Sequence, residues 1–194
     1  MVAAMKLQVG EPSAYLGADE VIESSAPSVV ELASRLRSDH LDDIEFVRAA
    51  YEWVRDRVQH SVDVGDPRVT LMPTQVLAEG VGLCFAKSHL LVALLRSQAV
   101  PAGLCYQRLA DGQGGHVLHG LVAVYLSDGW HRLDPRGNNE HVRAEFSLET
   151  ERLAWMPVPE LGEIDYPQVC AAPSPVVVAV LRSATDALEL CRSG

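Results

Sequence analysis

A buried central helix is the strongest structural signal in this sequence. From Cys84 to Arg96 no glycine or proline interrupts the chain, and the run Leu90 to Leu95 is apolar at every position. A helix without a polar face lies inside a domain, because all of its sides must be covered. The run is too short to cross a bilayer, since a spanning helix takes about 20 apolar residues. The rest of the chain is therefore expected to pack around this segment.

Helices are predicted before this segment. Ser28 to Glu31 has the form of a capping box and opens a helix to about Arg37. Asp42 to Glu45 has a similar form, and apolar residues then follow at steps of three and four: Ile44, Val47, Tyr51, Val54 and Val58. Thr74 is expected to cap a short helix through Ala78.

Strands are predicted after it. The runs 104–109, 119–126 and 130–134 are typical of strands, and a turn at 127–129 joins the last two. Residues 176–191 are expected to form a closing helix, or a strand followed by a helix. Helices before strands indicate an α+β fold, in which N-terminal helices and the buried central helix pack on an antiparallel β-sheet.

Composition narrows the class of protein. The chain has 194 residues, 48% of them hydrophobic and 22% charged, which predicts a single domain over 1–194. The net charge of −10 argues against a nucleic-acid partner, and no membrane segment is apparent. Met1 to Gly10 does not resemble a signal peptide, so the cytoplasm is the expected compartment. The oligomeric state stays open.

Cys84 stands at the predicted start of the central helix, after the glycine-flanked segment Gly80 to Gly82. Unpaired N–H groups and the positive end of the helix dipole favour a thiolate there, and the thiolate is the nucleophilic form of cysteine. The backbone N–H of Cys84 could also donate to an oxyanion. The other cysteines, Cys105, Cys170 and Cys191, are expected to be packed or exposed.

A thiolate needs a base, and the base needs an orienting group. His119 opens the strongest predicted strand, and Asp134 ends the next one. Strand alternation places both on one face of a hairpin. If Asp128 and Gly129 form a two-residue turn, however, Asp134 lies opposite Ala123, about 13 Å along the strand from His119. A functioning pair is therefore expected to need a wider loop or a bulge.

Several other residues are candidates for the same chemistry. His116 is a rival base, although a regular strand points it away from His119. His89 is expected to be a packed, hydrogen-bonded residue, and His131 a surface or core residue. Gln75 is a candidate side-chain donor to the oxyanion. A zinc site formed by His116, His119 and a cysteine has no recognised ligand spacing, so no metal or other cofactor is predicted.

Three motifs together resemble those of the transglutaminase-like superfamily. Gly82-Leu83-Cys84 with its apolar helix and Val100-Pro101 is similar to the cysteine motif. His119 opening the strand to Tyr125 is similar to the histidine motif, and Trp130 to Pro135 is similar to the aspartate motif. The resemblance covers roughly residues 44–139. It departs at Gly120, where the family usually has a larger residue, and at Leu121, which is often aromatic.

The resemblance implies a papain-like core in which Cys84, His119 and Asp134 form a catalytic triad. The expected reaction is attack on a peptide or glutamine-type amide, through an acyl-enzyme thioester, with water or an amine as acceptor. The expected partner is a peptide or protein substrate. Two alternatives remain: a catalytically silent module that binds peptides with the same cleft, and a metal-dependent hydrolase.

Overall fold

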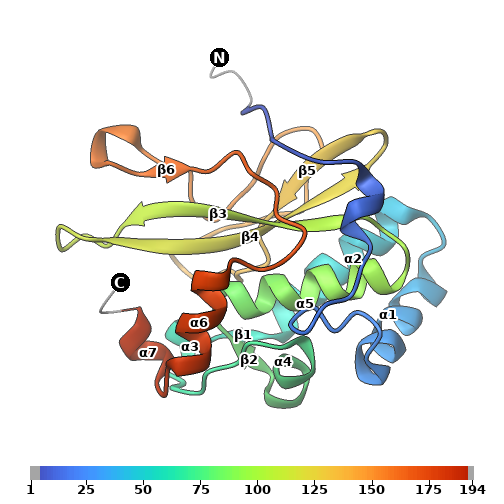
Figure 1. The fold of residues 1–194 in the computed structure, drawn as a ribbon, viewed down its shortest axis with the longest axis horizontal. Coiled ribbons are helices and arrows are strands. Elements are labelled where there is room, and N and C mark those ends of the chain that lie inside the picture. The colour runs from blue at the N-terminus through green and yellow to red at the C-terminus, as the bar shows by residue number, and fades with distance from the viewer. Residues whose placement is uncertain (1–4, 192–194) are drawn as a thin grey trace.

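The computed structural model describes residues 5–191 (Figure 1). Its helices, including short 3₁₀ turns η1 and η2, are η1 Pro12–Tyr15, α1 Pro27–Asp39, α2 Asp43–Arg57, α3 Ser61–Val64, α4 Pro73–Glu79, α5 Cys84–Ser97, η2 Pro159–Leu161, α6 Pro175–Ser183 and α7 Ala187–Leu190. Its strands are β1 Gln59–His60, β2 Val81–Gly82, β3 Ala102–Ala110, β4 His116–Leu126, β5 Gly129–Leu133 and β6 Ile164–Asp165. No helix among the described residues has the length and apolar character of a membrane span.

The predicted α+β architecture is confirmed. Four antiparallel strands form a sheet in the order β5-β4-β3-β6, and β1 and β2 make a separate parallel pair. Helix α5 runs beneath the sheet, while α6, α7 and α3 gather near the N-terminal end of α5 (Figure 1). This places the start of the central helix between the sheet and the C-terminal helices.

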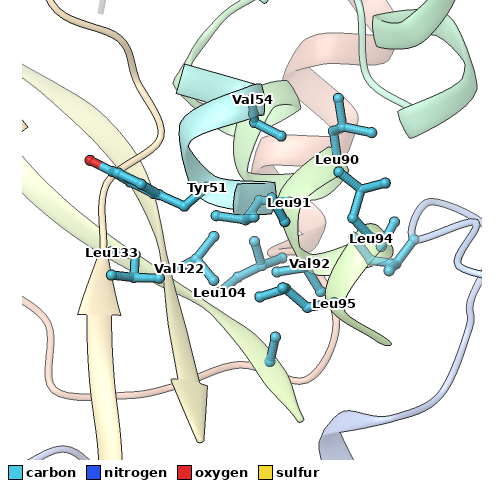
Figure 2. Packing of buried hydrophobic residues seen from close by; sticks show 14 of the residues in the cluster. Tyr51, Val54, Leu90, Leu91, Val92, Leu94, Leu95, Leu104, Val122 and Leu133 are labelled. Atoms are coloured by element: carbon cyan, nitrogen blue, oxygen red, sulfur yellow. The ribbon is translucent and has the colours of Figure 1, made fainter. Parts of the chain in front are cut away.

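The core forms where α5 meets the sheet on one side and α2 on another (Figure 2). The side chains of Leu90, Leu91, Leu94 and Leu95 are fully buried, as their apolar run predicts, and Tyr51 of α2 is buried with them. Burying a leucine-sized side chain is worth about 1.5–3 kcal/mol, so this contact fixes the helix firmly against its neighbours.

The hairpin between β4 and β5 closes with a two-residue turn, which lies one residue earlier than a turn at Asp128 and Gly129. Leu126 pairs with Gly129, so the two turn residues are Ser127 and Asp128, both with positive φ (50° and 63°). This is a type I′ geometry, whose twist matches that of the strands. Val122 then pairs with Leu133. The expectation that a functioning pair needs a wider loop or a bulge is therefore wrong.

Helix starts differ from the predicted caps in two places. Helix α1 begins at Pro27, so Ser28 lies inside the helix and forms no cap. Helix α4 begins at Pro73, and Thr74 bonds Glu23 instead. Proline is favoured at the first helical position because its missing N–H would have no partner there. Asp42 does cap α2, accepting from the N–H groups of Ile44 and Glu45.

Candidate active site

Cys84 is the first residue of α5, as predicted. Cys84 is buried, with 8% of the residue exposed, and it lines a cavity of about 400 Å³. The backbone N–H of Gly120 in β4 donates to its sulfur at 3.5 Å. A helix N-terminus and an N–H donor both favour negative charge on sulfur. Cys84 therefore borders the cavity at a helix N-terminus, beside a backbone donor to its sulfur.

The glycine two residues before Cys84 allows the helix to start in this place. A Cβ on Gly82 would lie 2.9 Å from Oγ1 of Thr70 and 3.2 Å from Cβ of Ala86. Thr70 is itself fixed by donating to the carbonyl of Val81 at 3.0 Å. These side chains lie so close to the backbone of residue 82 that glycine is required here. The pairing of β2 with β1 fixes the position of the backbone just before Cys84.

His119 and Asp134 form a direct hydrogen bond. Nε2 of His119 lies 2.8 Å from Oδ2 of Asp134, and both side chains are buried. With Val122 paired to Leu133, Asp134 continues the line of β5 one residue beyond the strand, which brings it within reach of His119. The bond to Nε2 leaves Nδ1 as the ring nitrogen free to exchange a proton.

The electrostatics of His119 favour a protonated ring. Burial opposes the charge, but the Asp134 carboxylate and the Cys84 side chain outweigh it and raise the pKa of His119 to about 10. An imidazolium held near a sulfur by a buried carboxylate is the arrangement that stabilises a thiolate–imidazolium pair.

Asp134 is anchored by backbone donors. The N–H of Arg136 donates to Oδ1 at 3.1 Å, and the N–H of Ala154 donates to Oδ2 at 3.0 Å. Burial opposes ionisation of Asp134, but His119 and these two bonds hold its pKa below the ordinary value. Trp155 follows Ala154 and packs edge-on against the His119 ring, 4.8 Å between centroids. The carboxylate is thus fixed in charge and position.

The rival residues lie elsewhere. His116 is in β4 and its Nε2 is 3.1 Å from the carbonyl of Leu161, outside the cavity lining. His89 is buried, with Nδ1 2.9 Å from the carbonyl of Leu71. His131 lies on β5, paired with Val124. Within residues 5–191 no group of three or more His, Cys, Asp or Glu side chains is arranged to hold a metal ion.

Gln75 is not in the cavity that Cys84 lines. Its Oε1 accepts from the N–H groups of Leu71 and Met72, at 3.0 and 3.1 Å, and so caps the start of α4. The Nε2–H group that could donate to an oxyanion therefore belongs to a side chain beside a different pocket, away from the Cys84 sulfur. The assignment of Gln75 as the oxyanion donor is therefore corrected.

Sequence reasoning missed His60 and Trp155, both of which line the cavity. His60 lies on β1 opposite Gly82, is 9% exposed, and its Nδ1 has no hydrogen-bond partner. Burial, with a smaller effect of Arg136, lowers the pKa of His60 to about 3, so its ring is neutral. Neither residue stands in a recognisable local pattern, because strand β1 has two residues and Trp155 lies in an irregular segment.

A family model of the transglutaminase-like superfamily matches residues 30–135, more than half of the chain. The chain belongs to this superfamily. The match begins in α1 and ends one residue after Asp134, so it covers every element that carries Cys84, His119 and Asp134. Trp155, α6 and α7 of this transglutaminase-like chain lie outside it.

A solved structure shares the fold of this transglutaminase-like chain. A candidate cysteine protease from Cytophaga hutchinsonii aligns with a TM-score of 0.56 at 19% identity, over 66% of this chain and 43% of that chain. The periplasmic domain of TgpA from Pseudomonas aeruginosa aligns with a TM-score of 0.48 at 20% identity, over 65% of this chain and 48% of that chain. This chain thus covers less than half the length of either. No curated protein matches it.

Proposed function

We propose that this transglutaminase-like chain is a thiol-dependent hydrolase or acyltransferase acting on amide bonds of peptides or proteins. The observation that carries the proposal is the buried hydrogen bond between His119 and Asp134 beside a cavity-lining Cys84 at a helix N-terminus. A packed structural cysteine would need neither the buried ion pair nor the cavity.

The proposed reaction has two stages. The Cys84 sulfur attacks the carbonyl carbon of the amide, and the protonated His119 ring gives its proton to the leaving amine as the C–N bond breaks. The acyl group is left as a thioester on Cys84. His119 then takes a proton from water or from a second amine, which attacks the thioester and releases the thiolate. Water yields a free acid and an amine yields a new amide.

The negative oxygen that forms at each stage needs donors. The backbone N–H of Cys84 is one, because the first N–H groups of a helix lack intrahelical partners. We assign the second role to His60, a neutral ring that lines the same cavity. A neutral imidazole donates one hydrogen bond without repelling the His119 cation.

Selective alkylation tests the proposal. Iodoacetamide at neutral pH, followed by peptide mass spectrometry, is expected to modify Cys84 faster than Cys105, Cys170 or Cys191. Cys84→Ala is expected to abolish turnover of a fluorogenic peptide amide, while Cys191→Ala, the matched control from the same cavity lining, retains it. If another thiol reacts first and Cys84 stays inert, the chain is not a thiol enzyme.

The acceptor and the compartment remain parts of the proposal. Adding a primary amine such as cadaverine distinguishes the acceptors: a transamidase incorporates it into the product, and a hydrolase releases the acid regardless. A cytoplasmic location would keep the Cys84 thiol reduced. Cell fractionation with an antibody against the chain tests it.

A further inference from the structure

The cavity at Cys84 has an apolar wall built from two distant parts of the chain. Leu109, Val117 and Leu118 come from the β3–β4 hairpin, and Val176, Val180 and Leu190 come from α6 and α7. Figure 1 shows α6 and α7 beside the N-terminal end of α5, below the end of that hairpin where its loop joins β3 to β4. The wall therefore faces the nucleophile from the sheet and from the C-terminal helices.

Helix α6 lines the cavity with both buried and exposed apolar side chains, Val177 and Leu181 among the buried ones. Val177 and Leu181 are each 4% exposed and pack into the core, which anchors the helix. Val176 and Val180 are 69% and 43% exposed, and both line the cavity. Leu118 of β4, 37% exposed, lines it as well. Exposed apolar side chains that gather around one cavity mark a binding site for an apolar group.

The charged side chains of the cavity already bind other groups, although the buried Nε of Arg136 has no partner. Arg136 makes two bonds to Asp63, at 2.5 and 2.8 Å. Glu163 accepts from the N–H groups of Ala110 and Val158, at 2.9 and 2.7 Å. His60 and His119 serve the reaction in the proposed function. A charged or amide side chain of a substrate would therefore lose its water shell in this cavity without gaining a free ionic partner.

We propose that the acyl group accepted by Cys84 carries a bulky aliphatic or aromatic side chain, of leucine or phenylalanine size, rather than the primary amide of a glutamine side chain. This inference rests on the proposed function for its chemistry. The apolar side chain would occupy the wall formed by α6 and the β3–β4 hairpin, while the carbonyl carbon lies at the Cys84 sulfur. Val176, Val180 and Leu118 would determine the specificity.

A set of peptidyl aldehydes with one backbone and a varied terminal side chain tests this. Rates of Cys84 modification are divided by the iodoacetamide rate, so that the intrinsic reactivity of the sulfur cancels. We expect the leucine and phenylalanine probes to exceed the glutamine, lysine and glutamate probes at least about tenfold, the discrimination typical of an apolar pocket. Equal ratios for leucine and glutamine would overturn the inference.

Two variants locate the effect. Val180→Asp is expected to lower the leucine-to-iodoacetamide ratio at least about tenfold, and Val180→Thr, which keeps the shape, to lower it less. Val30→Asp is the matched control, since Val30 is 37% exposed on helix α1 and does not line the cavity. Its ratio should equal that of the wild type. Thermal midpoints of all variants show whether each is folded.

A binding arm separates this inference from the proposed function. In Cys84→Ala, titration with a leucine peptide amide and its glutamine counterpart is followed by calorimetry, without any turnover. Tighter binding of the leucine peptide, weakened by Val180→Asp, supports the apolar site even if Cys84 proves unreactive. No preference between the two peptides would overturn the site even if Cys84 is a nucleophile.

Discussion

At the scale of single residues, the protonation of His119 depends on two neighbouring side chains, Asp134 and Cys84. Asp134 raises the pKa of His119 against the effect of burial, so the ring keeps its proton well above neutral pH. The shift also bears on stability: a raised histidine pKa stabilises the folded state fully below the unfolded value of about 6.5, and this contribution is lost as pH rises through the folded value.

Asp134→Asn should move the alkaline limb of the pH–kcat/KM profile to lower pH, because the neutral amide no longer supports the imidazolium. At neutral pH we expect kcat to fall about 100-fold or more, by analogy with other triads. The profile of the wild type and of the variant with one peptide amide is the measurement. An unshifted alkaline limb would show that another group holds the proton.

His60 gives a second prediction at this scale. His60→Ala should lower kcat about 100-fold with little change in KM, since an oxyanion donor acts only in the transition state. His60→Gln restores a side-chain N–H donor and should recover part of the rate. A purely structural role would instead lower the thermal midpoint in both variants and leave the rate of the folded fraction intact.

At the scale of elements, the site depends on how closely β4 lies to α5. Ser88 Oγ donates to the carbonyl of Gly120 at 3.2 Å, while the Gly120 N–H donates to Cys84. A Cβ on Gly120 would lie only 2.7 Å from the ring of Phe85. The small residue at this family position is therefore required by Phe85, and it allows strand and helix to meet at the sulfur.

Gly120→Ala should push β4 away from α5 and misplace His119 relative to Cys84. We expect kcat/KM to fall about 100-fold, as for a displacement of about 1 Å, and stability to fall by about 1–3 kcal/mol. Gly129→Ala in the same hairpin is the control, because its Cβ would meet only ordinary contacts, the nearest at 3.5 Å. Kinetics and urea unfolding of both variants test this, and equal losses would disprove it.

At the scale of the whole molecule, Arg96 of the central helix binds an N-terminal and a C-terminal segment of the chain. Its guanidinium donates to the carbonyls of Gly17, Ala102 and Ala171, at 2.7, 2.9 and 2.6 Å, and the residue is buried. The N-terminal arm and the segment leading to α6 thus share one anchor on α5. This arrangement agrees with the single domain expected from the sequence, which stays a prediction.

Calorimetric unfolding tests that prediction. One transition is expected for the full chain, because its terminal segments share the core with α5. Arg96→Met leaves the three carbonyls without this donor and should cost about 2 kcal/mol, lowering the midpoint by about 4–8 °C. Arg35→Met, at an exposed position of α1, should leave the midpoint within about 1 °C. Two separate transitions in the wild type would refute the single domain.

Local patterns in the sequence were enough to place the main elements and the three candidate catalytic residues. The apolar run of α5 has one stable environment, and strand alternation puts His119 and Asp134 on one face of a hairpin closed by a two-residue turn. These properties depend on neighbours in the chain. The register of the β4–β5 hairpin could not be predicted from local patterns. Ser127 and Asp128 adopt positive φ, although neither turn residue is a glycine.

Only the tertiary structure decided which further groups join the site. The site includes His60, Trp155 and α6, which come from segments of the chain up to about a hundred residues apart. No periodicity in the sequence predicts that such segments lie side by side. Gln75 is not at the site because the fold places it at the start of α4, beside a different pocket from the one that Cys84 lines. Residues that look alike in the sequence can therefore differ in role. Packing between distant segments determines which of them the fold leaves buried and unpaired.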